Sequence, residues 1–373
     1  MGPQQDARAD VFGGGQGHEP PELRRDPGER APLRYRGLSA GAVQPAQPLR
    51  QQPDPRAAGG LRVAHLQDDR ALRVRVLGVL DQITQAVVIG TITGAVYGLV
   101  ALGIVLVYKS SGVFNFAQGE FGTIGVYATF AAVEFWHLPY AVGVLVGLAA
   151  SVAAGLLTER LVIRPLFDAP RVTLLVATAG VALLAIGVEF WRSGDVQLRV
   201  LPPISTELQR VKVFGVSVSD QRLVILAVLV VVAVGLALFF NRTTLGLAVL
   251  GASQEPVASE LVGISVRRIS ALTWCLAAFV GGLAGILSAP ISQFAPGFLT
   301  SGALIAGFTA AVLGGMTSLP GAFVGGIVVG VAQALSTLDV FGDLPGAGAV
   351  IVFGLLLAVL LVRPQGLFGG RAA

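Results

Sequence analysis

Long apolar runs separated by short polar segments make up most of the sequence from residue 83 onward. A helix needs roughly 20 apolar residues to cross a bilayer core of about 30 Å, and several runs reach that length. Shorter runs are typical of broken or re-entrant helices. The pattern predicts an all-α polytopic membrane protein with about 8–10 transmembrane or partly re-entrant helices. The predicted segments are Ile83–Val107, Ala117–Phe135, Tyr140–Leu157, Val172–Trp191, Leu223–Phe240, Ser270–Ala289, Gly302–Met316, Ala322–Leu335 and Gly346–Val362.

Residues 1–80 differ in composition from the rest of the chain and contain no spanning run. They are rich in Pro, Gly, Arg, Asp and Gln, a composition that buries too little apolar surface to offset the entropy of an ordered chain. No apolar core of a signal peptide follows the first charges. We therefore expect a disordered N-terminal extension over 1–80, or a start codon assigned too far upstream, and a transmembrane domain over 81–368.

Charged residues make up 13% of the chain, about half the fraction usual in soluble domains, which agrees with a lipid-facing surface. The single cysteine, Cys275, excludes an internal disulfide, and the three histidines are scattered. Neither lysine, Lys109 or Lys212, follows a glycine, so the chain has no Walker A loop for ATP. We expect no catalytic residues, metal site or cofactor, and no interaction with nucleic acid, because acidic residues interleave with the N-terminal arginines.

Arginines gather in three segments between or after the apolar runs: residues 158–171, residues 241–269 and the C-terminal tail. Excess positive charge marks the cytoplasmic side of a membrane protein, so these segments are placed there. The alternating stretch VKVFGVSVS, residues 211–219, predicts a small extracytoplasmic hairpin.

Polar residues interrupt the apolar pattern between Tyr108 and Glu120. One interpretation is an ordinary interfacial loop. The other is a broken helix beside a substrate path, because polar groups at membrane depth face a cavity or one another. The second interpretation makes Asn115, Gln118, Gly119 and Glu120 the candidate site, and it requires a partner or water cavity for Glu120.

The loop 241–269 contains a stretch suited to a short helix, Glu255–Gly263. Pro256 fits the first turn of such a helix, and Gly263 fits a left-handed residue that ends it. The helix is either a plain connector or an element that docks in a groove of a soluble partner. Glycines spaced four residues apart predict close helix packing at Gly90/Gly94/Gly98, Gly143/Gly147, Gly281/Gly285 and Gly321/Gly325.

Three stretches carry a resemblance to a known family. The first is GAVYGLVALG at 94–103 running into NFAQGEF at 115–121, where family members show NFAHGE or glutamine in place of the histidine. The second is RTTLGLA at 242–248 followed by ASELVGISVR at 258–267, and the third is AAVLGGMTSLPGA at 310–322. Residues 83–366 thus resemble the permease of ATP-binding-cassette importers for branched-chain amino acids, the LivH type.

The resemblance implies a permease without enzymatic activity in the bacterial plasma membrane, the inner membrane. The implied partners are a second permease subunit, two ATPase subunits and an extracytoplasmic solute-binding protein. It also implies that loop 241–269 couples to an ATPase, through Glu255, Ala258, Glu260, Gly263, Arg267 and Arg268. The chain departs from the family at Val249 and Leu250, where members often carry a basic residue, and in its N-terminal extension.

The solute remains open at this point. Relatives carry urea, short amides, other amino acids or sugars, so the alternative solutes lie in the same superfamily. A stand-alone secondary carrier or channel, and a membrane scaffold without transport, are rivals of a different class.

Overall fold

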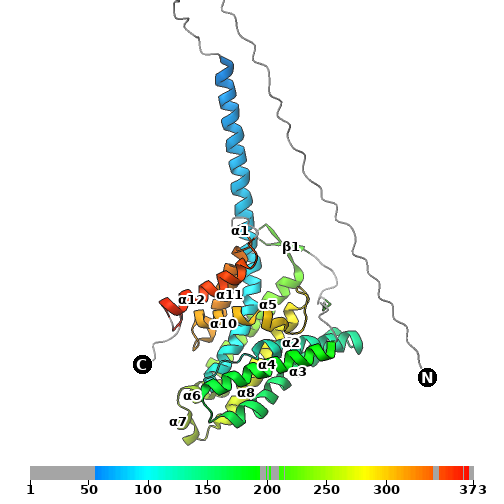
Figure 1. The fold of residues 1–373 in the computed structure, drawn as a ribbon, viewed down its shortest axis with the longest axis vertical. Helices are drawn as coiled ribbons and strands as arrows, with labels where there is room; N and C mark the ends of the chain where they lie inside the picture. Colours follow the sequence, from blue (N-terminus) through cyan, green and yellow to red (C-terminus); the bar gives the residue numbers. More distant parts are fainter. Residues whose placement is uncertain are drawn as a thin grey trace, which may run out of the picture. The chain divides into compact units, whose positions relative to one another are not determined.

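The computed structural model describes residues 55–193, 199, 201–202, 210–213, 215–338, 344–363 and 365–368, and all structural statements below refer to these residues. In chain order the elements are α1 Pro55–Ser111, α2 Gln118–Phe130, η1 Ala131–Phe135, α3 Tyr140–Thr158, η2 Glu159–Ile163, η3 Arg164–Leu166, α4 Arg171–Ser193, β1 Arg210–Val213, β2 Val216–Ser219, α5 Asp220–Arg242, α6 Thr244–Gln254, α7 Pro256–Leu261, α8 Val266–Ser288, α9 Phe298–Gly302, α10 Leu304–Gly314, α11 Leu319–Leu335 and α12 Ala347–Val362 (Figure 1).

Each of the nine predicted apolar segments coincides with helical structure, which confirms the all-α polytopic fold. Among the described residues, five helical stretches are long and apolar enough to cross a membrane: Leu77–Ser111, Tyr140–Leu166, Arg171–Ser193, Asp220–Arg242 and Val266–Ser288. The apolar helices α10, α11 and α12 are shorter. The alternating stretch forms the predicted hairpin, with β1 antiparallel to β2 and Gly215 at φ +85° between them.

The boundary of the N-terminal extension at residue 80 stays a prediction, and α1 extends across it. Helix α1 begins at Pro55, so it takes in residues that we expected to be disordered; residues 1–54 lie outside the described part of the chain. Proline is tolerated in the first turn of a helix, and no proline follows Pro55 before Pro139. The Arg, Ala and Leu residues after Pro55 have high helix propensity, which the composition argument overlooked.

Deleting residues 1–75 should leave membrane insertion and transport unchanged. The deletion keeps the whole candidate span Leu77–Ser111 intact. Uptake by cells producing the truncated protein should match that of the full chain at equal expression, measured by immunoblot of membranes. Loss of uptake at normal expression would show that the extension has a role.

Glycines bring α1 and α11 into backbone contact. A Cβ atom on Gly326 of α11 would lie 2.2 Å from the backbone nitrogen of Gly98, and one on Gly330 would lie 2.2 Å from the Cα of Gly94. Gly325 packs in the same way on the backbone of α10 at Ala310. Helices without a hydrophobic driving force between them associate through such close van der Waals packing. The predicted packing role of Gly94, Gly98 and Gly325 is confirmed, and Gly326 and Gly330 join them.

A second group of close contacts joins α2, α3 and α8. Gly125 and Gly282 both pack on Ser151, while Gly285 of α8 meets the backbone of Gly122. The side chains of Phe121 and Trp274 meet edge to face, with ring centroids 6.2 Å apart. These contacts fix the start of α2 against α8, which is where the polar segment of the sequence lies.

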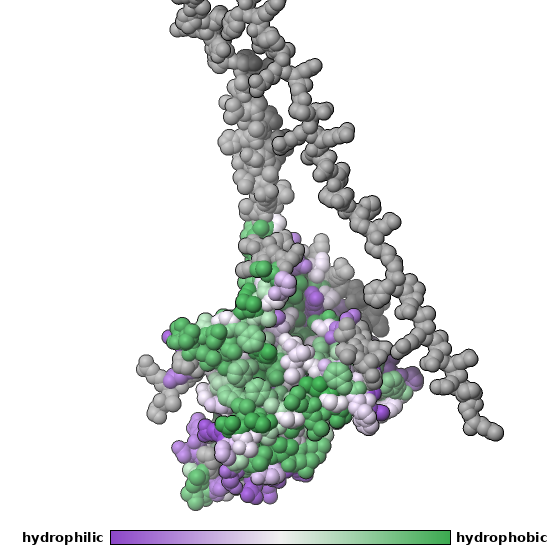
Figure 2. All heavy atoms as spheres, viewed as in Figure 1, coloured by the Kyte–Doolittle hydropathy of each residue, from purple (hydrophilic) through white to green (hydrophobic). Residues whose placement is uncertain are grey.

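Large apolar side chains remain exposed on α4, α5 and α12, among them Leu183, Leu184, Val231 and Leu361. Figure 2 shows hydrophobic residues over the middle of the helical bundle and hydrophilic residues gathered at the end where α6 and α7 lie. An apolar surface of this extent is suited to lipid or to neighbouring membrane subunits.

Candidate functional site

The chain breaks between α1 and α2, where residues 112–117 leave helical conformation. Gly112 adopts φ +64°, which permits the chain to turn there. Inside the break, Asn115 accepts a hydrogen bond from the backbone nitrogen of Ala117 at 3.0 Å. Its amide also donates to Oε1 of Gln118 at 3.3 Å. The polar side chains therefore satisfy the backbone and one another.

Gln118 ties the break to two other helices. Its Nε2 donates to the carbonyl of Ala277 in α8 at 2.9 Å, and its side chain lies against Gly103 of α1, where no Cβ would fit. Asn115, Gln118 and Glu120 are 2%, 0% and 0% exposed. An ordinary interfacial loop would expose such groups, whereas this segment is packed inside the protein. Gly119 packs closely on Thr300 of α9.

Replacing Gln118 by methionine should lower stability by about 1 kcal/mol, because a hydrogen bond between membrane helices contributes that much or less. Methionine keeps the unbranched shape but leaves the Asn115 amide without its acceptor. The midpoint of thermal denaturation in detergent measures the effect. A midpoint equal to that of the wild type would show that the amide contacts do not stabilise the break.

The sequence analysis missed the group that faces Glu120. The carboxyl of Glu189, near the end of α4, meets that of Glu120 at Gly297, whose backbone nitrogen donates to Glu189 and whose Cβ position lies 3.9 Å from Oε1 of Glu120. Glu189 sits within the run Val172–Trp191. An ionisable residue inside a candidate span is itself a signal of a functional position, and it could have identified Glu189.

A cavity of about 600 Å³ opens where α1 ends and α4 begins. The ends of α1, α6 and the segment 163–171 all border it, as does the start of α8. Its basic groups are Lys109, which donates to the carbonyl of Thr317 at 3.1 Å, and Arg171. Two of the three arginine-bearing segments thus meet at one end of the bundle, as expected if they share one side of the membrane.

Loop 241–269 folds into two short helices. Thr243 caps α6 by accepting a hydrogen bond from the backbone nitrogen of Gly246 at 3.0 Å. Glu255 precedes α7, and Pro256 occupies its first turn as predicted. The helical stretch was predicted as Glu255–Gly263, and the structure gives Pro256–Leu261 with Glu255 and Val262 as its flanking residues.

Gly263 ends α7 in the left-handed conformation that the sequence predicted, with φ +87°. Its backbone nitrogen donates to the carbonyl of Glu260 at 3.0 Å, and that of Ile264 donates to Ser259 at 2.9 Å. These two bonds define a Schellman motif, which satisfies the last carbonyls of the helix. The direction in which the chain leaves α7 is therefore fixed by one glycine.

The residues around α7 form an exposed surface. Glu255, Ala258, Glu260, Gly263, Arg267 and Arg268 are all exposed, whereas Ser259 is buried beside Gly251 of α6. Val257, Leu261 and Val262 are 72%, 84% and 76% exposed. Apolar side chains that are this exposed to solvent, at the hydrophilic end of the molecule, are typical of a protein interaction site.

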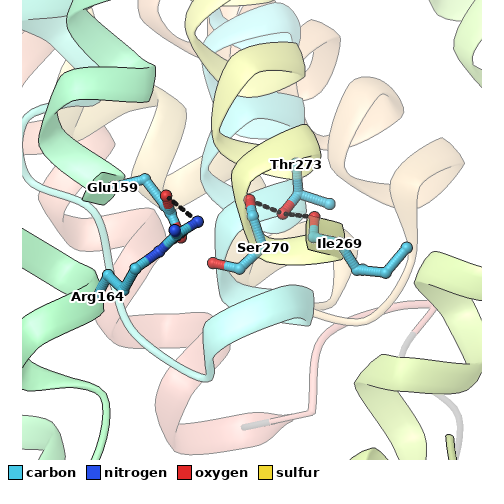
Figure 3. Close-up of polar contacts among 5 residues, drawn as sticks. All are labelled: Glu159, Arg164, Ile269, Ser270 and Thr273. Carbon is cyan, nitrogen blue, oxygen red and sulfur yellow. Dashed lines mark hydrogen bonds and ion pairs between the residues drawn. The ribbon is translucent and has the colours of Figure 1, made fainter. Parts of the chain in front are cut away.

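An ion pair with one buried partner lies near the same end. Glu159, 2% exposed, pairs with Arg164 at 3.2 Å, and Figure 3 shows the Ser270 hydroxyl of α8 directed toward that side. Thr273 donates to the carbonyls of Ile269 and Ser270 within α8 (Figure 3). The pair joins two residues of the turn that follows α3.

A bundle of apolar helices, a buried polar break between α1 and α2 and an exposed helical loop define a multi-pass membrane protein. The chain matches, over residues 86–361, the family described as "Branched-chain amino acid transport system / permease component". It therefore belongs to that family, which is one of transport components and not of enzymes. The resemblance drawn from the sequence motifs is confirmed.

Individual relatives agree with the family. The chain is 34% identical over 299 residues to the high-affinity branched-chain amino acid transport system permease protein BraD of Pseudomonas aeruginosa, a match covering 76% of this chain and 95% of that protein. It is 30% identical over 290 residues to LivH of Escherichia coli, covering 75% and 93%. A probable LivH of Methanocaldococcus jannaschii is 28% identical, with 73% and 88% covered.

Proposed function

We propose that the chain is a permease subunit of an ATP-driven importer and forms part of the translocation path for branched-chain amino acids. The observation that carries the proposal is the family match over 86–361, with relatives named for this transport at up to 34% identity. Urea, amide and sugar importers are the less favoured alternatives, because the relatives named above are all permeases of branched-chain amino acid transport.

The energy source is proposed to be a pair of ATP-binding-cassette ATPase subunits, since the sequence has no Walker A loop. A second permease subunit and an extracytoplasmic solute-binding protein complete the assembly, in the bacterial inner membrane. The exposed apolar faces of α4, α5 and α12 offer area for lipid and for the second permease.

Helix α7 is proposed as the contact with the ATPase. Val257, Leu261 and Val262 supply an apolar face, and Glu260 with Arg267 and Arg268 supplies exposed charges around it. A helix that lays an apolar face into a groove of its partner has this arrangement. Because α7 continues through Gly263 into α8, and α8 packs on Gln118, movement of α7 reaches the broken helix through one rigid element.

Asn115, Gln118, Gly119 and Glu120 are proposed to hold the broken helix beside the path. The cavity bordered by Lys109 and Arg171 is proposed to form the cytoplasmic end of this path. Its two basic groups suit the carboxylate of an amino acid on its way out.

Reconstitution tests the proposal. The chain is placed in liposomes with the ATPase, second permease and binding protein encoded beside its gene, and uptake of labelled leucine, isoleucine and valine is measured against urea, acetamide and ribose. We expect uptake of the three amino acids only with ATP inside. Uptake by the chain alone would favour a secondary carrier, and selective uptake of another solute would reassign the substrate.

A further inference from the structure

Two carboxyl groups from distant parts of the chain meet inside the bundle. Glu120 lies in the first turn of α2 and is fully buried, and Glu189 lies near the end of α4 and is 7% exposed. The two carboxyls come together at Gly297: its backbone nitrogen donates to Oε2 of Glu189, and a Cβ atom built on it would lie 3.9 Å from Oε1 of Glu120. Permease assembly and coupling, as proposed above, assign no role to this contact.

Most of the oxygens in this pair have no hydrogen-bond partner among the described residues. Both oxygens of Glu120 and Oε1 of Glu189 are buried without one, as is the hydroxyl oxygen of Thr300. The exception is Oε2 of Glu189, which accepts from the backbone nitrogen of Gly297 at 2.9 Å. Gly297 adopts φ +73°, the conformation that begins α9.

No described cation forms an ion pair with either carboxyl; the ion pair found in the described part of the chain is Arg164 with Glu159. The guanidinium of Arg199 lies over the rings of Tyr127 and Phe130, 5.7 Å and 5.5 Å from their centroids. It donates to the carbonyl of Ser193 at 3.3 Å. The remaining groups that face the pair are Thr123, Thr300 and Tyr127.

Two adjacent carboxylates cannot both stay ionised in a buried site without a cation, because like charges repel strongly at low dielectric. A protonated carboxyl is an O–H donor and an ionised one is an acceptor, so a single proton supplies the missing hydrogen bond for both. We propose that Glu120 and Glu189 form a proton-binding site in which one shared proton joins the two carboxyls and holds α4 against α2 and α9.

The site has a consequence for movement of α4. The interaction between the two carboxyls, which joins this helix to the core, changes from attraction to repulsion when the shared proton leaves. With the proton bound, the pair attracts; without it, two negative charges repel and α4 is released from the α2–α9 surface. Release is therefore favoured at high pH and prevented at low pH, and on the proposed transport function this links opening of the bundle to proton release.

Infrared spectroscopy of the full-length protein in lipid nanodiscs tests the site. The wild type at neutral pH should show the C=O stretching band of a protonated carboxyl. Each of the isosteric variants Glu120→Gln and Glu189→Gln should lose that band, because the remaining carboxylate then accepts from the new amide. The matched control Glu134→Gln changes an exposed glutamate and should keep it. Size-exclusion profiles and thermal midpoints confirm that the variants are folded.

A missing band in the wild type at neutral pH would overturn the proposal, and so would a band that persists in both single variants, which would mean two independent protons. A band that disappears on raising the pH of the wild type, with faster hydrogen–deuterium exchange of α4, supports it. These readouts need no solute or ATPase. A protein with the band that fails to import any branched-chain amino acid therefore contradicts the transport proposal alone.

Discussion

Replacing Gly326 by alanine should cost about 3 kcal/mol of stability, the upper part of the range for inserting atoms into a packed core. The added Cβ would lie 2.2 Å and 2.3 Å from the backbone N and Cα of Gly98, and 2.7 Å from the carbonyl oxygen of Gly94. Backbone atoms cannot rotate away as a side chain does, so α1 and α11 would have to separate. We expect a large fall in the thermal midpoint and reduced yield of monodisperse protein.

The matched control is Gly354→Ala in α12, where no atom lies within 4 Å of the added Cβ. Both substitutions add one methyl group to a helical glycine, and alanine is the better helix former in each case. Thermal denaturation in detergent followed by size-exclusion chromatography compares them directly. If the two variants have equal midpoints, the close approach of α1 and α11 is not required for stability.

Replacing Gly263 by valine should uncouple ATP hydrolysis from uptake or prevent assembly with the ATPase. No neighbouring atom lies within 4 Å of an added Cβ, so the effect must come from the backbone at φ +87°. A β-branched residue is strained there by roughly 1 kcal/mol or more. A strain of one to two kcal/mol reduces the population of the correctly directed helix about 5–30-fold.

Gly263→Asn is the control for this prediction, because asparagine tolerates the left-handed conformation better than other non-glycine residues. Co-purification of the ATPase and solute-stimulated hydrolysis are measured for both variants in reconstituted complexes. The asparagine variant should retain most of both activities. Should the valine variant also retain binding and coupled transport, the contact would have to be reassigned to the turn 158–171.

The helices were predictable because membrane-spanning segments need long apolar runs, and each run in the sequence marks a helix within the described residues. The left-handed end of α7 was also predictable from the local sequence, because a glycine, Gly263, stands where the helix ends. The start of α1 was not, because polar helix formers resemble disordered sequence when composition alone is considered.

The partner of Glu120 could not be found from spacing. The rest of α2, all of α3 and most of α4 separate Glu120 from Glu189 in the sequence. The two carboxyls come together only because α4 packs beside α2. Gly297 and Thr300 join the same site from α9, from still farther along the sequence. Contacts of this kind depend on the packing order of helices, which an apolar pattern does not encode.

The glycine contacts between α1 and α11 also restrict how the bundle deforms. Gly94 and Gly98 rest against Gly326 and Gly330. Sliding one helix along the other would bring larger residues to these positions, where there is no room for a side chain. The two helices therefore behave as one rigid body, and bending is confined to the non-helical joints that flank it, at 112–117 and at Gly315, whose φ is +97°.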